Sequence, residues 1–549
     1  MSERVFERAN DRARSSANVN GVNRLPRWLA PAAATVPVVL LAVFYVWPFA
    51  TVAARGLSRS GLADTLGSAL TWRIVWFTLW QAMVSTVLTV LLGLAPAYVV
   101  ARYRFPGRRL LDGLLTAMFV LPTVVMGAAV MAVLPTSLDR GVVAIVVAHV
   151  VFNLAVVVRT VGATLAALPR DLEAAAATLG APPWRTFAAV VLPRLRASIA
   201  AAAGIVFVFT FTSYGVVRLL GGPRRSTIEV EVWRQATQFG DLDAAATLAL
   251  LQLLLVGTFV VLGGRHGRRA VLTVDARIGE LRAVPRRGRQ RRFVAAVALT
   301  TMVVVVTPLV GLVLRSLRPG DRYSFAAWTH LGRTEVRPGI ALGVDPLQSL
   351  RVSIEAMALA TLLAVVVGTL AAVAVTVAHR HGWLLDTGLM LPLATSAVTV
   401  GLGLVITFDS APFDWRASWW LVPVGQALVA LPLVVRTVVP PLDSIGPGPV
   451  EAAATLGAPP LRAWWTSAGP RLRRPVVVAA GLAATVSLGE FGATSVLTRS
   501  GRETVPIAIE RLLGRTGGLV HAQAYVLAVI LAAATVAVVM LIDLASTRR

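Results

Sequence analysis

The chain has 549 residues, of which 56% are hydrophobic and only 14% charged, whereas soluble domains carry roughly 25% charged residues, so the composition is that of a membrane protein. The net charge is +25 and all 52 basic residues are arginine, but the arginines are not gathered on one face among aromatic residues, and we expect no nucleic acid partner. Without lysine the chain cannot supply a conventional Walker A loop, and without cysteine it has no disulfide, thiol nucleophile or thiolate metal site.

Apolar runs of about 20 residues, long enough to cross roughly 30 Å of hydrocarbon, follow one another along the sequence. Residues 1–28 mix arginine with acidic residues and are interpreted as a cytoplasmic segment, because the run that follows is too long for a signal-peptide core. The first group of predicted spans is 29–54, 74–101, 111–135, 141–167, 197–220 and 242–264. The second group is 293–314, 349–378, 383–408, 418–441, 474–498 and 521–545.

The two groups are separated by a basic segment, residues 265–292. We therefore predict four parts: a cytoplasmic N-terminal segment (1–28), a first repeat (29–264), a basic cytoplasmic linker (265–292) and a second repeat (293–549). With both termini in the cytoplasm, the larger share of the arginines lies inside, as the positive-inside rule requires.

A short segment that occurs twice shows that the two halves are repeats. The sequence EAAAATLGAPP begins at Glu173, and EAAATLGAPP begins at Glu451. Gly457 lies 457 − 180 = 277 positions after Gly180. The same shift aligns other residues over some 65 positions, including His149 with Gln426. An even number of spans in each unit gives both copies the same orientation, so the repeats are parallel.

Each copy lies between the fourth and fifth spans of its repeat, on the predicted cytoplasmic side. The alanines favour helix, Gly180 and Gly457 suit a helix C-terminus, and Pro183 and Pro460 suit the first turn of a second helix. We expect a helix, a turn and a helix outside the membrane. An amphipathic segment resting on lipid headgroups is the alternative, but the apolar surface and the repetition favour a partner protein.

The second copy, EAAATLGAPPLRAWWTSAGPRLRRP, resembles the EAA loop of binding-protein-dependent ABC importer permeases. The resemblance covers nearly all of the chain after its first 25 or so residues. It is greatest to fused, double-unit permeases of the ferric-iron and thiamine type, through SLGEFGATSVL from Ser487, GGPRRSTIEVEVWRQ from Gly221 and AHVVFNLAVVVRT from Ala148. It implies an all-α membrane protein of two parallel six-helix repeats, about twelve transmembrane helices like those of type I ABC importers.

In such permeases the loop seats in a groove of a separate ATPase subunit. The resemblance therefore implies two ATPase copies, ATP bound there and no cofactor on this chain, an extracytoplasmic solute-binding protein, and a multi-pass position in a bacterial inner membrane. The first copy departs from the pattern, because Glu173 stands one place before the register position, Ala174. The coupling residues that the resemblance implies are Glu173, Ala175, Gly180, Ala181, Pro193, Glu451, Ala452, Gly457, Ala458 and Pro470.

Ionisable side chains at membrane depth are candidates for a solute pathway. Glu490 lies within the eleventh predicted span, and a shift of 277 aligns it with Ser213. An interhelical hydrogen bond is the alternative role for Glu490, and a surface position is the alternative for Glu355. If Glu490 faces the pathway, its charge favours a cation, and thiamine and ferric iron both fit. The candidate pathway residues are Glu490, Ser213, Tyr214, Phe491, Glu355 and Trp80.

Other classes of protein explain less of the sequence. A secondary transporter also has parallel six-helix repeats, but it gives no reason for two EAA loops. A membrane enzyme should show a metal-binding or nucleophilic constellation, and the chain has six histidines, no cysteine and no HExxH motif. A receptor or structural protein should have large soluble domains. We therefore expect an importer permease that is not itself an enzyme.

Overall fold

The computed structural model describes residues 29–169, 171–222, 225–267, 283–285, 288–332, 335–337, 340–378, 382–409, 413–416, 418–445 and 447–547. Within these ranges ten helices are long and apolar enough to cross a membrane, or up to twelve if each of two bent pairs is one span. The predicted all-α membrane fold is confirmed; a small hairpin of β1 (Glu335–Arg337) and β2 (Ile340–Ala341) is added to it. The predicted segment 1–28 and most of the linker 265–292 lie outside the described residues.

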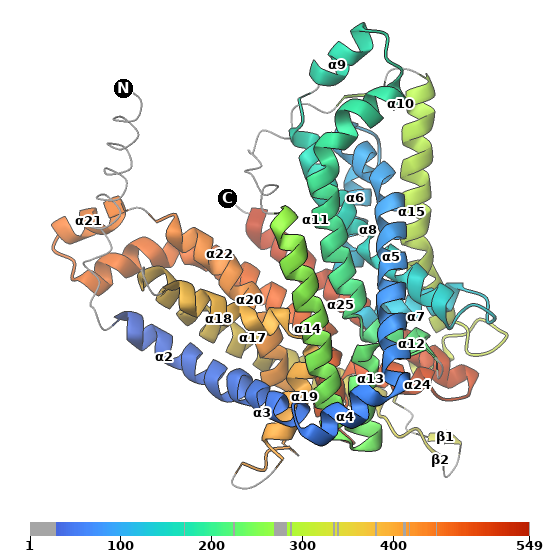
Figure 1. The fold of residues 1–549 in the computed structure, drawn as a ribbon, viewed down its shortest axis with the longest axis vertical. Helices are drawn as coiled ribbons and strands as arrows, with labels where there is room; N and C mark the ends of the chain where they lie inside the picture. Colours follow the sequence, from blue (N-terminus) through green and yellow to red (C-terminus); the bar gives the residue numbers. More distant parts are fainter. Residues whose placement is uncertain are drawn as a thin grey trace. The chain divides into compact units, whose positions relative to one another are not determined.

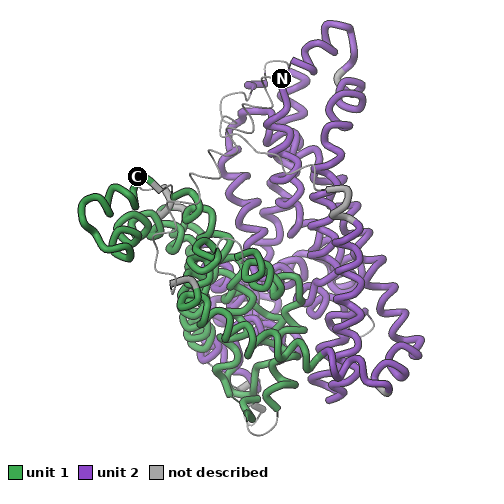
Figure 2. Tube along the Cα trace, turned by 60° about the vertical axis from the view of Figure 1, so that its left-hand side comes forward, with its two compact units in different colours: residues 1–52, 350–502, 537–549 green, residues 53–349, 503–536 purple. Residues whose placement is uncertain are grey.

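Contacts within the chain divide it into two units (Figure 2). Unit 1 comprises residues 1–52, 350–502 and 537–549, and unit 2 comprises residues 53–349 and 503–536. Unit 1 thus contains the first predicted span together with most of the second repeat. Unit 2 contains the rest of the first repeat, the linker, the first predicted span of the second repeat (293–314) and a segment from near the C-terminus. The packing units cut across the repeats, whose boundaries come from the sequence and stay a prediction.

Unit 2 is arranged around the long helix α5 (Ala69–Arg102), which packs along α8 (Val142–Ala167) and α11 (Leu192–Phe211). Close approach depends on Gly93, because a Cβ there would lie 2.7 Å from the Val157 side chain. Figure 1 shows α9 and α10 at one end of this unit and α12, α13 and α24 at the other. Its remaining elements are α4 (Arg59–Gly67), α6 (Arg108–Val120), α7 (Thr123–Val133), α9 (Asp171–Thr178), α10 (Pro183–Thr186), α12 (Gly215–Leu220), α13 (Ile228–Arg234), α14 (Leu242–Gly267), α15 (Gly288–Ser316), α16 (Ala326–Thr329), α24 (Val505–Leu513) and the π-helical turns η2 (Phe187–Val191) and η3 (Gln235–Phe239).

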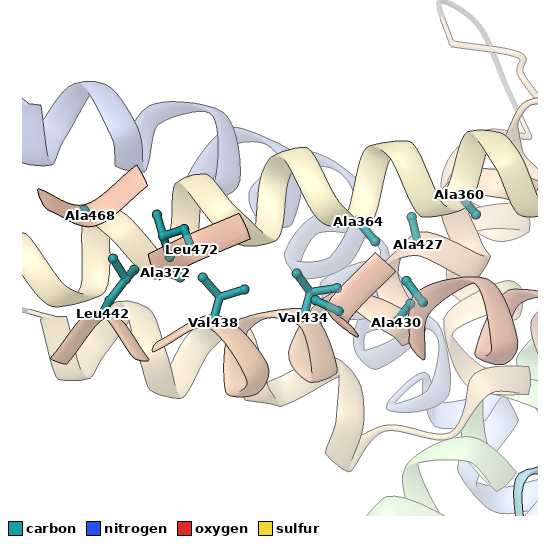
Figure 3. Close-up of a cluster of buried hydrophobic side chains, with 12 residues drawn as sticks. Ala360, Ala364, Ala372, Ala427, Ala430, Val434, Val438, Leu442, Ala468 and Leu472 are labelled. Atoms are coloured by element: carbon teal, nitrogen blue, oxygen red, sulfur yellow. The ribbon is translucent and has the colours of Figure 1, made fainter. Parts of the chain in front are cut away.

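Unit 1 is arranged around α20 (Leu421–Asp443) and α22 (Pro460–Gly489), with α17 (Pro346–Val377) completing a core rich in alanine (Figure 3). Small side chains let membrane helices approach closely. A Cβ on Gly368 would lie 2.6 Å from Val434, the residue that the repeat aligns with Val157 (157 + 277 = 434). The remaining elements are α2 (Leu29–Leu41), η1 (Ala42–Val46), α18 (Gly382–Ala394), α19 (Ala397–Thr407), α21 (Pro447–Thr455) and α23 (Gly492–Leu497), while α3 (Trp47–Gly56), α17 and α25 (Gly518–Thr547) have residues in both units.

The predicted spans 111–135 and 383–408 are sharply bent rather than continuous. The chain bends by 112° between helices α6 and α7, and by 99° between helices α18 and α19. At the first bend, Leu121 precedes Pro122 and has an extended backbone (ψ 139°), because a residue before proline is excluded from the helical region. At the second, the Ser396 hydroxyl accepts from the backbone N–H of Thr399 (3.2 Å) and starts the new helix. Hydropathy did not predict either bend, since both sides are apolar.

The predicted spans 197–220 and 474–498 are also interrupted. In the first repeat α11 ends at Phe211 and α12 starts at Gly215; in the second, α22 ends at Gly489 and α23 starts at Gly492. Glu490 therefore lies at a break between helices and not within a continuous span. The two repeats break at aligned positions, so each unit has an interrupted helix at this point.

Candidate coupling loops and solute pathway

The first EAA segment forms the predicted helix, turn and helix. Helix α9 ends at Thr178, and Gly180 follows with a φ of +77°. The backbone N–H of Gly180 donates to the carbonyl of Ala177 (3.0 Å), and that of Ala181 donates to the carbonyl of Ala176 (3.1 Å). These two bonds make a Schellman motif, which satisfies the last carbonyls of the helix. Ala175 lies within α9, and Pro193 lies in the first turn of α11.

The second segment repeats this geometry bond for bond. Gly457 has a φ of +84°, and its N–H donates to the carbonyl of Ala454 (3.0 Å). The N–H of Ala458 donates to the carbonyl of Ala453 (3.1 Å). Here, however, the helix after the turn is α22 itself, which starts at Pro460 and contains Pro470. Glu451 and Ala452 lie in α21, before the turn.

Each turn presents an exposed leucine. Leu179 is 88% exposed and Leu456 is 89% exposed. Both lie next to a glycine with positive φ, which turns the chain there. A Cβ added to either glycine would have no other atom of the described chain within 4 Å. Within the chain, glycine is therefore required at these positions by the positive φ and not by a close contact. A single exposed apolar side chain is normal on a protein surface, so a docking role for the two leucines stays a prediction.

An ion pair ties the first loop to a transmembrane helix. Arg102, at the end of α5 and 5% exposed, donates to Glu173 of α9 at 2.6 Å. It also donates to the carbonyl of Leu168, at the end of α8 (3.0 Å). In the second repeat the aligned positions are His379 (102 + 277) and Val450 (173 + 277), which cannot form this pair. By residue type, these aligned positions do not offer an arginine and a carboxylate.

Glu490 is 6% exposed and caps the short helix α23. Its carboxylate accepts hydrogen bonds from the backbone N–H groups of Ala493 (2.7 Å) and Thr494 (2.8 Å), and from the Thr494 hydroxyl. These donors come from the next helical turn. Phe491, beside it, is buried. The assignment of Glu490 to a solute pathway stays a prediction.

At the aligned break of the first repeat, Ser213 and Tyr214 are also buried. The Tyr214 ring lies 6.4 Å from the ring of Trp233 in α13. His149 and Gln426, aligned by the repeat, each make a hydrogen bond between helices, to Ser85 (3.2 Å) and Ser487 (2.5 Å) respectively. These buried polar groups hold helices together within their own units.

Glu355 is 38% exposed and pairs with Arg351 one turn earlier (2.7 Å), so the structure places it in a surface ion pair. Trp80 is 40% exposed and lines a cavity of about 810 Å³ in unit 2. Its apolar lining residues are Leu70, Ile74, Trp76, Phe77, Trp80, Val142 and Phe239. Its polar lining residues are Arg73, Arg225, Ser226, Glu231, Arg234 and Gln235.

Glu231 and Glu510 are among the acidic groups of low exposure in unit 2 that sequence reasoning did not single out. Glu231, 3% exposed, accepts from Gln235 (2.9 Å) and Arg234 (3.3 Å). Glu510 of α24 pairs with Arg218 of α12 at 2.6 Å, and burial raises the pKa of Glu510 while Arg218 opposes the rise. Glu231 belonged to the quoted segment IEVEVW, whose acids inside an apolar run were the available signal. The pair of Arg218 and Glu510 joins residues that are 292 positions apart in the sequence (510 − 218), so no local sequence pattern predicts it.

Comparisons with known proteins identify the family of the chain. Residues 89–264 match the family described as binding-protein-dependent transport system inner membrane component. The thiamine transport system permease protein ThiP of Brucella abortus is 28% identical over 508 residues, covering 87% of this chain and 88% of that protein. ThiP of Salmonella typhimurium is 26% identical, covering 89% of this chain and 92% of that protein.

The sulfate transport system permease protein CysT of Escherichia coli is 31% identical over 213 residues, covering 35% of this chain and 77% of that protein. CysT thus matches a part of the chain, whereas the thiamine permeases match nearly its full length. With the repeated loops and the membrane helices, these matches show that the chain belongs to the binding-protein-dependent ABC importer permeases, as a fused double-unit member.

Proposed function

We propose that this permease imports thiamine, or a solute with a closely similar positively charged ring. The observation that carries the proposal is that relatives named as thiamine permeases align with 87–89% of this chain. The cavity beside Trp80 offers aromatic faces, which attract cationic rings, but its three arginines outnumber Glu231, so the proposal rests on the relatives and not on the charge of this cavity. Among the solutes that the sequence left open, the full-length relatives favour thiamine over ferric iron.

The two loops are proposed to dock one ATPase subunit each, with ATP bound on those subunits and not on this chain. Two turns with the same hydrogen bonds, each beside a leucine nearly 90% exposed, suit two copies of one partner. An extracytoplasmic solute-binding protein then delivers the solute at the opposite end. This arrangement requires the loops and both termini to be cytoplasmic, in a bacterial inner membrane.

Uptake by proteoliposomes tests the proposal. The permease is reconstituted with its ATPase and its solute-binding protein, and uptake of radiolabelled thiamine, ferric iron and sulfate is compared. We expect thiamine uptake that needs ATP hydrolysis and the binding protein. Uptake driven by an ion gradient without the ATPase would instead indicate a secondary transporter. Faster uptake of iron or sulfate than of thiamine would contradict thiamine as the substrate and would leave the ATP-driven mechanism in place.

A further inference from the structure

A groove on unit 2 runs along the outer face of α15. Its volume is about 460 Å³. One wall is the face of α15 that carries Val294, Ala298, Leu299 and Met302, and the other wall is the turn from Arg104 to Gly107 after α5. The surface is apolar along its length, and arginines Arg104 and Arg291 lie at one end. Both arginines are exposed.

The end with the arginines is the end that carries the first coupling loop. Arg104 lies two residues after Arg102, which contacts Glu173 of α9. From Arg291 to Met302 is 302 − 291 = 11 residues of helix, or about 16 Å at 1.5 Å per residue. The hydrocarbon of one leaflet is about half of 30 Å. The groove therefore has the depth of one leaflet, with its charge at the level of the headgroups.

Hydrogen bonds give the groove a fixed third wall. The backbone N–H of Arg104 donates to the carbonyl of Ala283 (2.9 Å), and the N–H of Ala283 donates to the carbonyl of Arg102 (3.1 Å). The Nε of Arg291 donates to the carbonyl of Pro285 (3.1 Å). Val284 and Pro285 are thereby held against the groove, which they line. The end of the inter-repeat linker thus joins α5 to α15 beside the arginines.

We propose that this groove is a binding site for one anionic phospholipid, in the leaflet on the side of the coupling loops. An acyl chain covers the apolar face of α15, and the phosphate lies between Arg104 and Arg291. Basic pockets between membrane helices at this depth bind anionic headgroups. A soluble phosphate makes no use of the apolar length, and a zwitterionic lipid gains less from two cations. The bound lipid connects α5, the linker and α15 at the base of the first loop.

Native mass spectrometry of the purified full-length chain tests this. The protein is titrated with phosphatidylglycerol and, separately, with phosphatidylcholine of the same acyl chains. The test variant is Arg104→Gln with Arg291→Gln. The control is Arg194→Gln with Arg196→Gln, which removes the same charge from two exposed arginines at the same end of α11.

We expect the wild type and the control to retain one phosphatidylglycerol more than the test variant. The affinity of that lipid should fall roughly 30-fold in the test variant, which corresponds to about 1 kcal/mol for each arginine near an anionic headgroup. Ala298→Phe, which keeps both arginines and fills the groove, should lose the same lipid. This second variant also decides the question if the double variant is not recovered in folded form.

Three results would overturn the proposal. Equal retention of phosphatidylglycerol by the wild type, the double variant and Ala298→Phe would show that the groove does not bind this lipid. Equal retention of phosphatidylcholine by the wild type would reduce it to an unselective lipid contact. Displacement of the lipid by inorganic phosphate alone would make it an anion site without a lipid.

Discussion

The carboxylate of Glu490 shows how an acidic residue is accommodated among apolar helices. A buried carboxylate is costly unless hydrogen-bonded, and Glu490 obtains two backbone N–H groups and a hydroxyl from the start of α23. Helix N-termini favour negative charge, because their first N–H groups have no partner within the helix. The break after α22 is what brings these donors within reach. The acid and the break therefore depend on each other.

Replacing Glu490 with Gln should destabilise unit 1. An amide keeps one oxygen and directs an NH₂ group at a donor, so one buried N–H loses its acceptor, at a cost of about 1–3 kcal/mol. Thermal unfolding in detergent measures this. Glu490→Ser, which introduces the residue of the aligned position 213, is a second comparison. An unchanged unfolding temperature with slower thiamine uptake would instead support a place in the solute pathway.

The pair formed by Arg102 and Glu173 should matter for coupling rather than for assembly. Arg102→Gln removes the ionic link between α5 and the first loop. We expect the ATPase to remain bound while solute-stimulated ATP hydrolysis falls. A double-mutant cycle with Glu173→Gln separates the pair from its surroundings. Additive effects of the two single changes would show that the ion pair has no role.

At the scale of elements, the two loops make a prediction about backbone angle. Gly180→Val and Gly457→Val place a β-branched residue at a φ near +80°, which costs roughly 1–2 kcal/mol at each turn. The turns should reshape, and the ATPase should be lost while the protein remains inserted. Gly204→Val in α11 is the control, since no atom lies within 4 Å of its Cβ and its φ is ordinary. Unchanged ATPase binding and transport in the double loop variant would contradict the docking role.

A second prediction concerns helix packing. Gly93→Ala and Gly368→Ala each put a methyl group less than 3 Å from a valine of the facing helix, so α5 must shift from α8, and α17 from α20. We expect a lower unfolding temperature for both. Gly204→Ala adds the same methyl group in open space and should be neutral or stabilising by up to about 1 kcal/mol. Equal unfolding temperatures for all three variants would contradict the close approach.

Features that depend on neighbouring residues in the sequence were predicted, and features that depend on residues far apart in the sequence were missed. The Gly180 and Gly457 turns depend on a few neighbouring residues, and the sequence predicted them. The bends at Leu121 and Ser396 each lie between two apolar helices, so the hydropathy of the sequence does not reveal them. Pro122 was a local signal for the first bend. The Arg102 to Glu173 pair joins residues 71 apart, and its geometry exists only once three helices are packed.

At the scale of the whole molecule, both repeats are present in one chain, so one copy supplies both loops. We expect a complex of one permease with two ATPase subunits. Native mass measurement of the purified complex checks this directly. Two permease copies in the complex would contradict it.

The exchange of segments between the packing units predicts how the chain responds to cutting. If residues 1–275 and 276–549 are produced as separate fragments, each lacks part of both units. We expect either fragment alone to be degraded or aggregated, and the two produced together to assemble and bind the ATPase. A stable, monodisperse N-terminal fragment would show that the first repeat folds independently.

The same exchange constrains how the protein is made. Unit 1 takes its first segment from residues up to 52 and its next from residue 350 onward, so 350 − 52 = 298 positions separate them. At about 5–20 residues per second this is roughly 15–60 s of synthesis. During that time α2 and η1 are in the membrane without α19, which η1 contacts in the finished protein. Unit 2 likewise lacks residues 503–536 until late in synthesis, so neither unit is complete before translation of the chain is nearly finished.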